Sequence, residues 1–401
     1  MLWLLLVVIG VFLRQSYQAP SLLADSTKVA SCVTQKEGGK TPKINHYTPV
    51  SFEEIEQVAQ GAAKGPKDYQ YKAASSEAFV YQHMKEFGFH KDNNPKTCPA
   101  IEREEIKPSL DQYREELKAY HKLIEDFKPI DDLRYHLDYN HSICQKLDLV
   151  PGGLPQIFPS QQLSLTPSGY VEPLLPPLRH LDYCDVQPSN SLWGWWNYDK
   201  ERAREALMDM TYLVHDFGHM CRQLKKTSRI VLIDMGASLE FHQAMETRLS
   251  PPIYLTSVYQ KMGFKFDHIY AFEITPASPG TVFELVPETL QSAYHWINIG
   301  VSSKVGAKNN PLTMLLREFN EDDLIVVKLD IDTSFIEVPL AHQILENDHF
   351  ANLIDQFYFE HHVHMQELRR SWGDTMEGTV EDSLKLFTGI REKGIASHYW
   401  A

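Results

Sequence analysis

The sequence predicts an α/β protein: a doubly wound, mostly parallel sheet, preceded by a largely helical and irregular N-terminal extension. From residue 199 onward, short apolar runs alternate with helical patterns, which is typical of parallel strands joined by crossover helices. The first run, Arg229-Ile-Val-Leu-Ile-Asp-Met-Gly-Ala-Ser238, has the composition of a buried strand ending in an acid and a glycine turn. Because glycine has no Cβ, a cofactor can approach the backbone closely at such a turn.

The predicted elements of residues 199–401 follow one another in regular order. Asp199 can cap a helix from Lys200 to about Leu224. Strands are then expected at 229–234, 268–273, 294–299, 324–330, 355–361 and 396–400. Helices are expected near 253–262, 281–292, 311–319, 335–346 and 379–393. We therefore interpret residues 199–401 as one Rossmann-like domain.

Residues 1–24 are predicted to be a signal peptide or an anchor. Leu2 to Leu13 is an apolar run of 12 residues, interrupted only by Gly10 and ended by Arg14. Such a run is short for crossing about 30 Å of hydrocarbon, but it suits the apolar region of a signal peptide. We expect the secretory pathway, secreted or in the ER or Golgi lumen, with membrane anchoring or organelle targeting as alternatives.

Residues 25–198 form the predicted N-terminal extension. Glu102 to Phe127 has the pattern of a long amphipathic helix, and residues 131–147 have that of a short one. Eight prolines between residues 151 and 190 argue against regular helix and central strand there. The segment 191–197 is rich in tryptophan. The chain has five cysteines, and one or two disulfides are expected if it enters an oxidising lumen.

The charge of the chain restricts its partners. The formal net charge is −14, with 43% hydrophobic and 23% charged residues. Nucleic-acid binding requires a basic face, so an acidic chain of this kind is not expected to bind nucleic acid. We expect membrane contact only through an uncleaved N-terminal anchor.

Acidic residues follow the first two predicted strands of the sheet. Asp234 ends the first strand, ahead of the turn Gly236-Ala237-Ser238. Glu273 ends the second strand, where an acid commonly accepts hydrogen bonds from ribose hydroxyls. The two acids are 39 residues apart, where about 20 is usual, which indicates an insertion after the first strand.

The fourth predicted strand ends in Asp330 and Asp332. Alternation along the strand puts both carboxylates on one face at the carboxyl edge of the sheet, where ligands of open α/β sheets bind. Two like charges at this spacing need a metal, a proton or a cationic partner. Asp332 could instead cap the following helix.

The fifth predicted strand ends in a group of candidate proton acceptors. In Phe359-Glu-His-His-Val-His364, alternation places Glu360, His362 and His364 on one face and His361 on the other. Glu360 or a histidine such as His361 could act as the general base; the alternative is ordinary polar residues at a strand end.

A second pair of histidines lies within the predicted helix from Lys200. His215 and His219 are four residues apart, so they would share a helix face and could both reach a metal. Such pairs more often lie at a helix surface, and we assign no metal ligands from the sequence.

The motifs Asp234-Met-Gly-Ala-Ser238, Ala271-Phe-Glu273 and Lys328-Leu-Asp330-Ile-Asp332 resemble, in this order, those of FkbM-type methyltransferases. The resemblance covers roughly residues 228–400 and implies a class I Rossmann-like enzyme that uses S-adenosylmethionine to methylate hydroxyl oxygens. It implies that Gly236 and its neighbours Asp234, Ala237 and Ser238 face the methionine part of the cofactor. Glu273, with Ile274, would hold the ribose, and Asp330 would lie beside the reacting methyl.

Three functional hypotheses remain open at this point. The first is an S-adenosylmethionine-dependent methyltransferase acting on a hydroxyl of a glycan or a small molecule. The second is a lumenal glycosyltransferase, because Asp330-Ile-Asp332 also resembles the metal-binding DxD motif of those enzymes. The third is a degenerate, non-catalytic methyltransferase-like protein, because Ser238-Leu-Glu240 stands where the family usually has a further glycine.

Overall fold

The computed structural model describes residues 70–93, 95–137, 142–150, 152–175, 209–239, 251–365 and 375–400. All of them belong to the unit Val50–Ala401. The predicted signal peptide or anchor and the tryptophan-rich segment 191–197 lie outside the described residues, as does the proposed cap Asp199.

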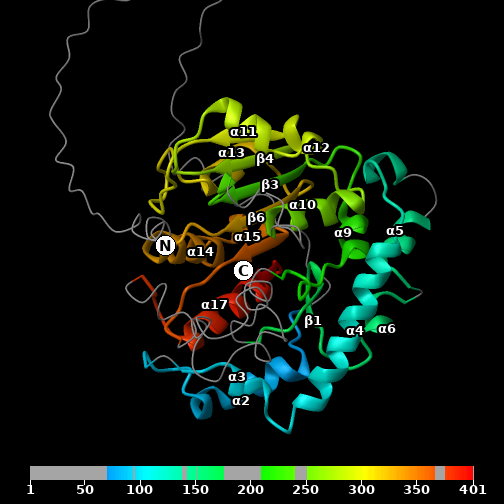
Figure 1. Ribbon diagram of the computed structural model, residues 1–401, viewed down its shortest axis with the longest axis vertical. Coiled ribbons are helices and arrows are strands. Elements are labelled where there is room, and N and C mark those ends of the chain that lie inside the picture. The colour runs from blue at the N-terminus through cyan, green and yellow to red at the C-terminus, as the bar shows by residue number, and fades with distance from the viewer. Residues whose placement is uncertain are drawn as a thin grey trace, which may run out of the picture. The chain divides into compact units, whose positions relative to one another are not determined.

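Six parallel strands form the central sheet (Figure 1). They are β3 (Ile230–Met235), β4 (His268–Phe272), β5 (Tyr294–Ile297), β6 (Leu324–Leu329), β7 (Gln356–Phe359) and β8 (Ala396–Tyr399). Each lies within one or two residues of its predicted position. The order across the sheet is β5-β4-β3-β6-β7-β8. The chain therefore reverses its direction of travel between β3 and β6, as in Rossmann-like folds. The predicted α/β class with a parallel sheet is confirmed.

Apart from Asp234 and Lys328, the central strands β3 and β6 consist of apolar residues, because both faces of the sheet are covered. Every residue of β3 and β6 is buried, including Asp234 and Lys328, whereas the edge strand β5 is only partly buried. Parallel strands covered on both faces read as continuous apolar runs in a sequence. Asp234 pairs with Lys328 in the β3–β6 register, so the two side chains lie on the same face.

The helices of this domain agree with the prediction except at three places. They are α9 (Phe217–Gln223), α10 (Pro251–Lys261), α11 (Pro279–Leu285), α12 (Glu288–Gln291), α13 (Leu312–Glu318), α14 (Ser334–Glu346), α15 (Asp348–Leu353) and α17 (Val380–Glu392). The helix predicted near 281–292 is divided into α11 and α12. Pro287 lacks an amide hydrogen and disfavours helical geometry at Val286, which is extended. The short helix α15, whose N-cap is Asn347, was not predicted.

The helix predicted from Lys200 to Leu224 is wrong over residues 209–216, which are not helical. The Asp216 side chain accepts a hydrogen bond from the His219 amide and starts α9 at Phe217. Just upstream, the Tyr120 hydroxyl bonds both the backbone nitrogen and the carbonyl of His215. His215 and His219 therefore do not share a helix face. The His215 Nε2 atom lies 2.8 Å from the Tyr358 hydroxyl.

The described residues of the extension form one long helix, several shorter helices and a hairpin. Its elements are α2 (Ser75–Phe87), α3 (Cys98–Ile101), α4 (Lys107–Asp126), η1 (Leu133–His136), α5 (Ser142–Leu147), α6 (Leu154–Ile157), β1 (Ser164–Thr166) and β2 (Gly169–Val171). The long helix α4 confirms the predicted amphipathic helix, with Pro108 in its first turn. The proline-rich region is more regular than predicted, since it holds α6 and the antiparallel pair β1–β2. Within the described residues, no helix is both long and apolar enough to cross a membrane.

The extension is joined to the last strand of the sheet by buried charges. Arg391 in α17 is fully buried and donates to the Ser397 carbonyl in β8. Its guanidinium lies 3.4 Å from Glu77 and 3.7 Å from Glu172, two carboxylates of the extension. The Glu172 carboxylate also lies 2.8 Å from the His398 ring. A disulfide between Cys144 in α5 and Cys221 in α9 adds a covalent link.

We expect His215 to make the stability of the protein depend on pH. Burial, followed by the neighbouring His398, lowers the pKa of His215 from 6.5 to about 3. Below pH 6.5 the unfolded chain binds a proton that the folded chain excludes, so the free energy of unfolding falls as the pH falls. Between pH 6.5 and pH 4 this histidine alone accounts for about 3 kcal/mol. The measurement is urea unfolding at several pH values.

In His215→Gln the pH dependence should become shallower over this range, while the exposed control His90→Gln should keep the wild-type slope. Equal slopes for wild type and His215→Gln would show that His215 is not held neutral by the fold.

Candidate functional site

A cavity of about 470 Å³ opens at the carboxyl end of the sheet. Its walls come from the ends of β3, β4, β5 and β6 and from the start of α14. The lining residues are Gly236, Ser238, Phe272, Glu273, Ile274, Thr275, Ile299, Gly300, Val301, Asp330, Ile331, Asp332, Thr333 and Ile336. The volume lies in the usual range for a small-molecule site. Its position beside the β3–β6 reversal is where open α/β sheets bind ligands.

Gly236 allows two strand ends to meet at the floor of the cavity. Its backbone has a φ of +90°, and a Cβ added there would lie 1.5 Å from the carbonyl oxygen of Asp330. The amides of Gly236 and Ala237 both donate to the Phe272 carbonyl of β4. The predicted glycine turn is therefore present. Ser238 lines the cavity, whereas Ala237 is buried.

Lys328 lies beneath this floor with its ammonium group fully enclosed. Its Nζ atom lies 3.0 Å from Asp234 Oδ1, 3.1 Å from the Gly236 carbonyl and 3.2 Å from Asp330 Oδ2. Burial would lower the pKa of Lys328, but the carboxylates of Asp234 and Asp330 outweigh burial and raise it. The two acids after β6 were expected to need a cationic partner, and for Asp330 this partner is Lys328.

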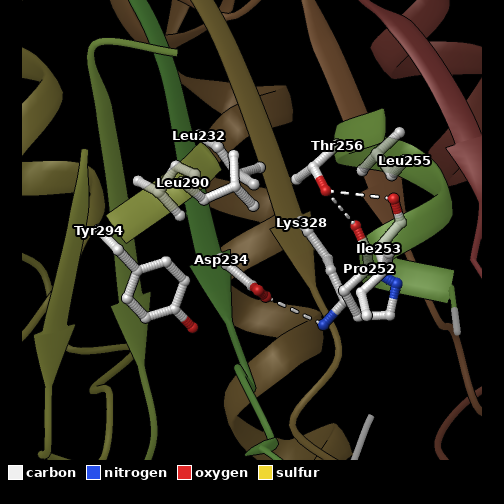
Figure 2. A pocket seen from close by; sticks show the side chains of 10 residues that line it. Leu232, Asp234, Pro252, Ile253, Leu255, Thr256, Leu290, Tyr294 and Lys328 are labelled. Carbon is white, nitrogen blue, oxygen red and sulfur yellow. Dashed lines mark hydrogen bonds and ion pairs between the residues drawn. The ribbon is translucent and has the colours of Figure 1, made fainter. Parts of the chain in front are cut away.

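Asp234 is placed away from the cavity, although the resemblance assigned it to the cofactor. Figure 2 shows Asp234 and Lys328 pointing at one another from β3 and β6, with Tyr294 and Leu290 nearby. The space beside them measures only about 10 Å³, too small for a ligand group. Asp234 therefore acts on the site through Lys328.

Glu273 stands at the mouth of the cavity with apolar neighbours. Its carboxylate accepts a 2.6 Å hydrogen bond from the Thr275 amide, and its carbonyl accepts from the Asn298 side chain. Ile274 is 74% exposed and Ile299 is 46% exposed, although both line the cavity. Exposed apolar side chains therefore lie beside a carboxylate in the lining of the cavity.

Asp330 lies at the inner end of the cavity. The Trp400 indole donates to its Oδ2 atom at 3.0 Å, on the same oxygen that faces Lys328. Burial and the adjoining Glu360 carboxyl, which is hydrogen-bonded to Asp330, raise the pKa of Asp330 well above its usual range. Asp330 therefore takes up a proton more readily than an exposed aspartate does.

Asp332 does not cap the following helix, whose N-cap is Thr333. Instead, Glu337 of α14 accepts hydrogen bonds from the amides of Ile331 and Thr333 and holds the turn that contains Asp332. Burial raises the pKa of Glu337 to about 7. Asp332 is exposed and has a φ of +55°, a backbone conformation that aspartate tolerates better than most residues.

Glu360 and His361, the candidate bases after β7, point to opposite sides of the chain, as the alternation of side chains predicts. Glu360 is buried against Asp330, and His362 lies 3.2 Å from Glu360. His361 faces α17, where its Nδ1 atom lies 3.0 Å from the Ser383 hydroxyl and its ring stacks on Phe359. Burial lowers the pKa of His361 to about 3. Neither candidate base is among the lining residues of the cavity, but Glu360 lies against the lining residue Asp330, whereas His361 faces α17.

Several lining residues were not among the candidates from the sequence. Thr275 follows β4, and Ile299, Gly300 and Val301 follow β5. Lys328 of β6, which contacts Asp330 from outside the lining, was not a candidate either. The rule that ligands bind at the carboxyl ends of strands could have identified the residues after β5. The role of Lys328 depends on the β3–β6 pairing, which the sequence does not display.

Comparison of the chain with known protein families, with curated proteins and with solved structures finds no match.

We expect Gly236→Ala to destabilise the protein through contact with Asp330. The substitution combines a positive φ with a clash against a backbone carbonyl, so a loss of about 3 kcal/mol is expected. Gly306→Ala is the matched control, because Gly306 has a φ of +74° but nothing within 4 Å of the added Cβ. The control should lose only about 1 kcal/mol. Urea unfolding measures both, and equal losses would exclude a tight β3–β6 contact.

Proposed function

We propose that this protein is an S-adenosylmethionine-dependent O-methyltransferase acting on a hydroxyl of a small molecule or glycan. The observation that carries the proposal is the charge of the cavity. Its described lining includes Glu273, Asp330 and Asp332 but no lysine, arginine or histidine. S-adenosylmethionine carries a sulfonium and an ammonium group, and carboxylates favour such a ligand. Phosphate groups would be repelled by them.

The positions of individual lining residues also support S-adenosylmethionine as the ligand. Glu273 can accept hydrogen bonds from ribose hydroxyls. Ile274 and Ile299 offer apolar contact to the adenine, and the Cβ-free turn at Gly236 admits the methionine part. A cofactor without a pyrophosphate does not require the full three-glycine fingerprint of dinucleotide sites.

Methyl transfer demands little from the protein beyond alignment and a proton acceptor. The acceptor oxygen attacks the methyl carbon, the carbon–sulfur bond breaks, and its electron pair stays on sulfur. Asp330, whose pKa is raised by burial and by the neighbouring Glu360, is the proposed acceptor of the hydroxyl proton. His361 has no part in this proposal, because its ring lies against Phe359 and Ser383.

The glycosyltransferase alternative receives less support from this geometry. A DxD motif needs both carboxylates for a metal bound to a nucleotide diphosphate, whereas Asp330 is engaged by Lys328 and Trp400. The degenerate alternative predicts no binding of the methyl donor.

We also propose that the chain enters an oxidising compartment of the secretory pathway. The disulfide between Cys144 and Cys221 and a further disulfide at Cys98 support this location, since such bonds are rare in the cytosol.

Binding of S-adenosylmethionine tests the proposed function. At about 100 times its dissociation constant, the cofactor should raise the free energy of unfolding by about 2.7 kcal/mol in thermal or urea denaturation. A UDP-sugar with manganese should give no such increase. The reverse pattern would support the glycosyltransferase, and no effect of either ligand would support a degenerate protein.

Glu273→Ala should weaken binding of S-adenosylmethionine at least tenfold in calorimetry, because the ribose loses its acceptor. The matched control is Glu284→Ala, which removes an exposed carboxylate on α11 outside the cavity lining and should bind as wild type does. If Glu273→Ala and the control bind equally well, the cofactor does not occupy this cavity as proposed.

A further inference from the structure

Two carboxylates and one imidazole converge beside the cavity: Asp332 after β6, and Glu360 and His362 after β7. One ligand atom from each lies within 4.8 Å of the other two. His362 Nε2 is 3.2 Å from Glu360 Oε1 and 3.9 Å from Asp332 Oδ1. The neighbouring parallel strands β6 and β7 bring these side chains to the same edge.

The three groups are held in place by the surrounding fold. The Glu337 carboxylate binds the amides on both sides of Asp332 and so holds its turn. His362 is 1% exposed, and its carbonyl accepts from the Glu377 amide at 3.0 Å. Glu360 is 6% exposed and its amide donates to the Leu329 carbonyl. A constellation held on rigid strand ends needs little rearrangement to take a ligand.

The charge at this edge calls for a cation. The carboxyl groups of Asp330, Asp332, Glu337 and Glu360 lie near one another, and the ammonium of Lys328 is already shared between Asp234 and Asp330. Buried or crowded carboxylates require protons, cations or both. The ligand atoms of Asp332, Glu360 and His362 face a shared centre, where one cation can contact all three side chains.

We propose that Asp332, Glu360 and His362 bind a divalent transition-metal ion such as Zn²⁺ or Mn²⁺. An imidazole nitrogen with two carboxylate oxygens matches the ligands of these metals, whereas Mg²⁺ and Ca²⁺ prefer oxygen alone. Three protein ligands leave coordination positions for water or substrate, as in catalytic metal sites.

The location of the proposed metal site indicates what the metal would do. This inference rests on the proposed methyltransferase function. Asp332 belongs both to the ligand set and to the cavity lining, so the metal would lie at the cavity wall. A metal held by Asp332, Glu360 and His362 would act as a Lewis acid toward an acceptor hydroxyl and would make that hydroxyl more acidic.

Metal binding is measured on the full-length protein after removal of metals with a chelator. Calorimetry with ZnCl₂, MnCl₂ and MgCl₂ should show one equivalent of Zn²⁺ or Mn²⁺ and much weaker Mg²⁺. Cobalt(II) gives an independent readout, since its visible absorption spectrum changes with nitrogen ligation and a low coordination number.

Asp332→Asn and His362→Gln should each weaken metal binding at least tenfold and alter the cobalt spectrum. The first changes an exposed side chain, so loss of folding is not expected. His364→Gln is the matched control, since it alters a histidine two residues further along and outside the cluster; it should bind metal as wild type does.

The proposal is overturned if the wild-type protein binds none of these ions at millimolar concentration, or if Asp332→Asn and His362→Gln bind them as tightly as wild type. S-adenosylmethionine binding is measured separately on the same samples. Metal binding without cofactor binding would contradict the methyltransferase function and support the metal site. Cofactor binding without metal binding would support the methyltransferase function and contradict the metal site.

Discussion

The ammonium group of Lys328 is the interaction on which the carboxyl edge of this sheet depends. It joins β6 to β3 through Asp234, the Gly236 carbonyl and Asp330, all within 3.2 Å. An isolated buried ammonium would cost several kcal/mol, and only such close acceptors offset that cost. Because these partners come from both sides of the β3–β6 reversal, the lysine sets the floor of the cavity and the position of Asp330.

The cavity above this lysine carries more negative charge than one cation can balance. Burial raises the pKa of Asp330 and of Glu337, so these two carboxyl groups bind a proton more readily than exposed ones do. Among the other carboxylates, Glu273 and Asp332 line the cavity. The proposed cationic cofactor and the proposed metal ion would each neutralise part of this negative charge. One would lie along β4 and β5, and the other between the ends of β6 and β7.

The N-terminal extension contributes to the same core as the sheet. Arg391 and His398, on α17 and β8, are buried against Glu77 and Glu172 of the extension. Removing one member of a buried charge network leaves the others without compensation, which is strongly destabilising. The extension therefore supports β8, which lies at the opposite edge of the sheet from β5, and Trp400, which follows β8, donates to Asp330.

Elements dominated by local pattern were predictable from the sequence. The six strands lie within one or two residues of their expected positions, because strands buried on both faces are continuous apolar runs. The glycine turn at Gly236 and the acids at Glu273, Asp330 and Asp332 were also evident as residues that follow such runs. The helix expected before β3 failed over residues 209–216, because the Asp216 cap and Tyr120 of a distant helix decide the conformation there.

By itself, the sequence determined the class of fold, the strands and the edge at which the acids gather. Only the tertiary structure decided what those acids do. Asp234 pairs with Lys328, His361 turns toward α17, and Asp332 meets Glu360 and His362. The physical reason is that a strand pattern specifies which face a side chain occupies. Its partner, however, is set by which strands become neighbours, and β3 and β6 are separated by about 90 residues of chain.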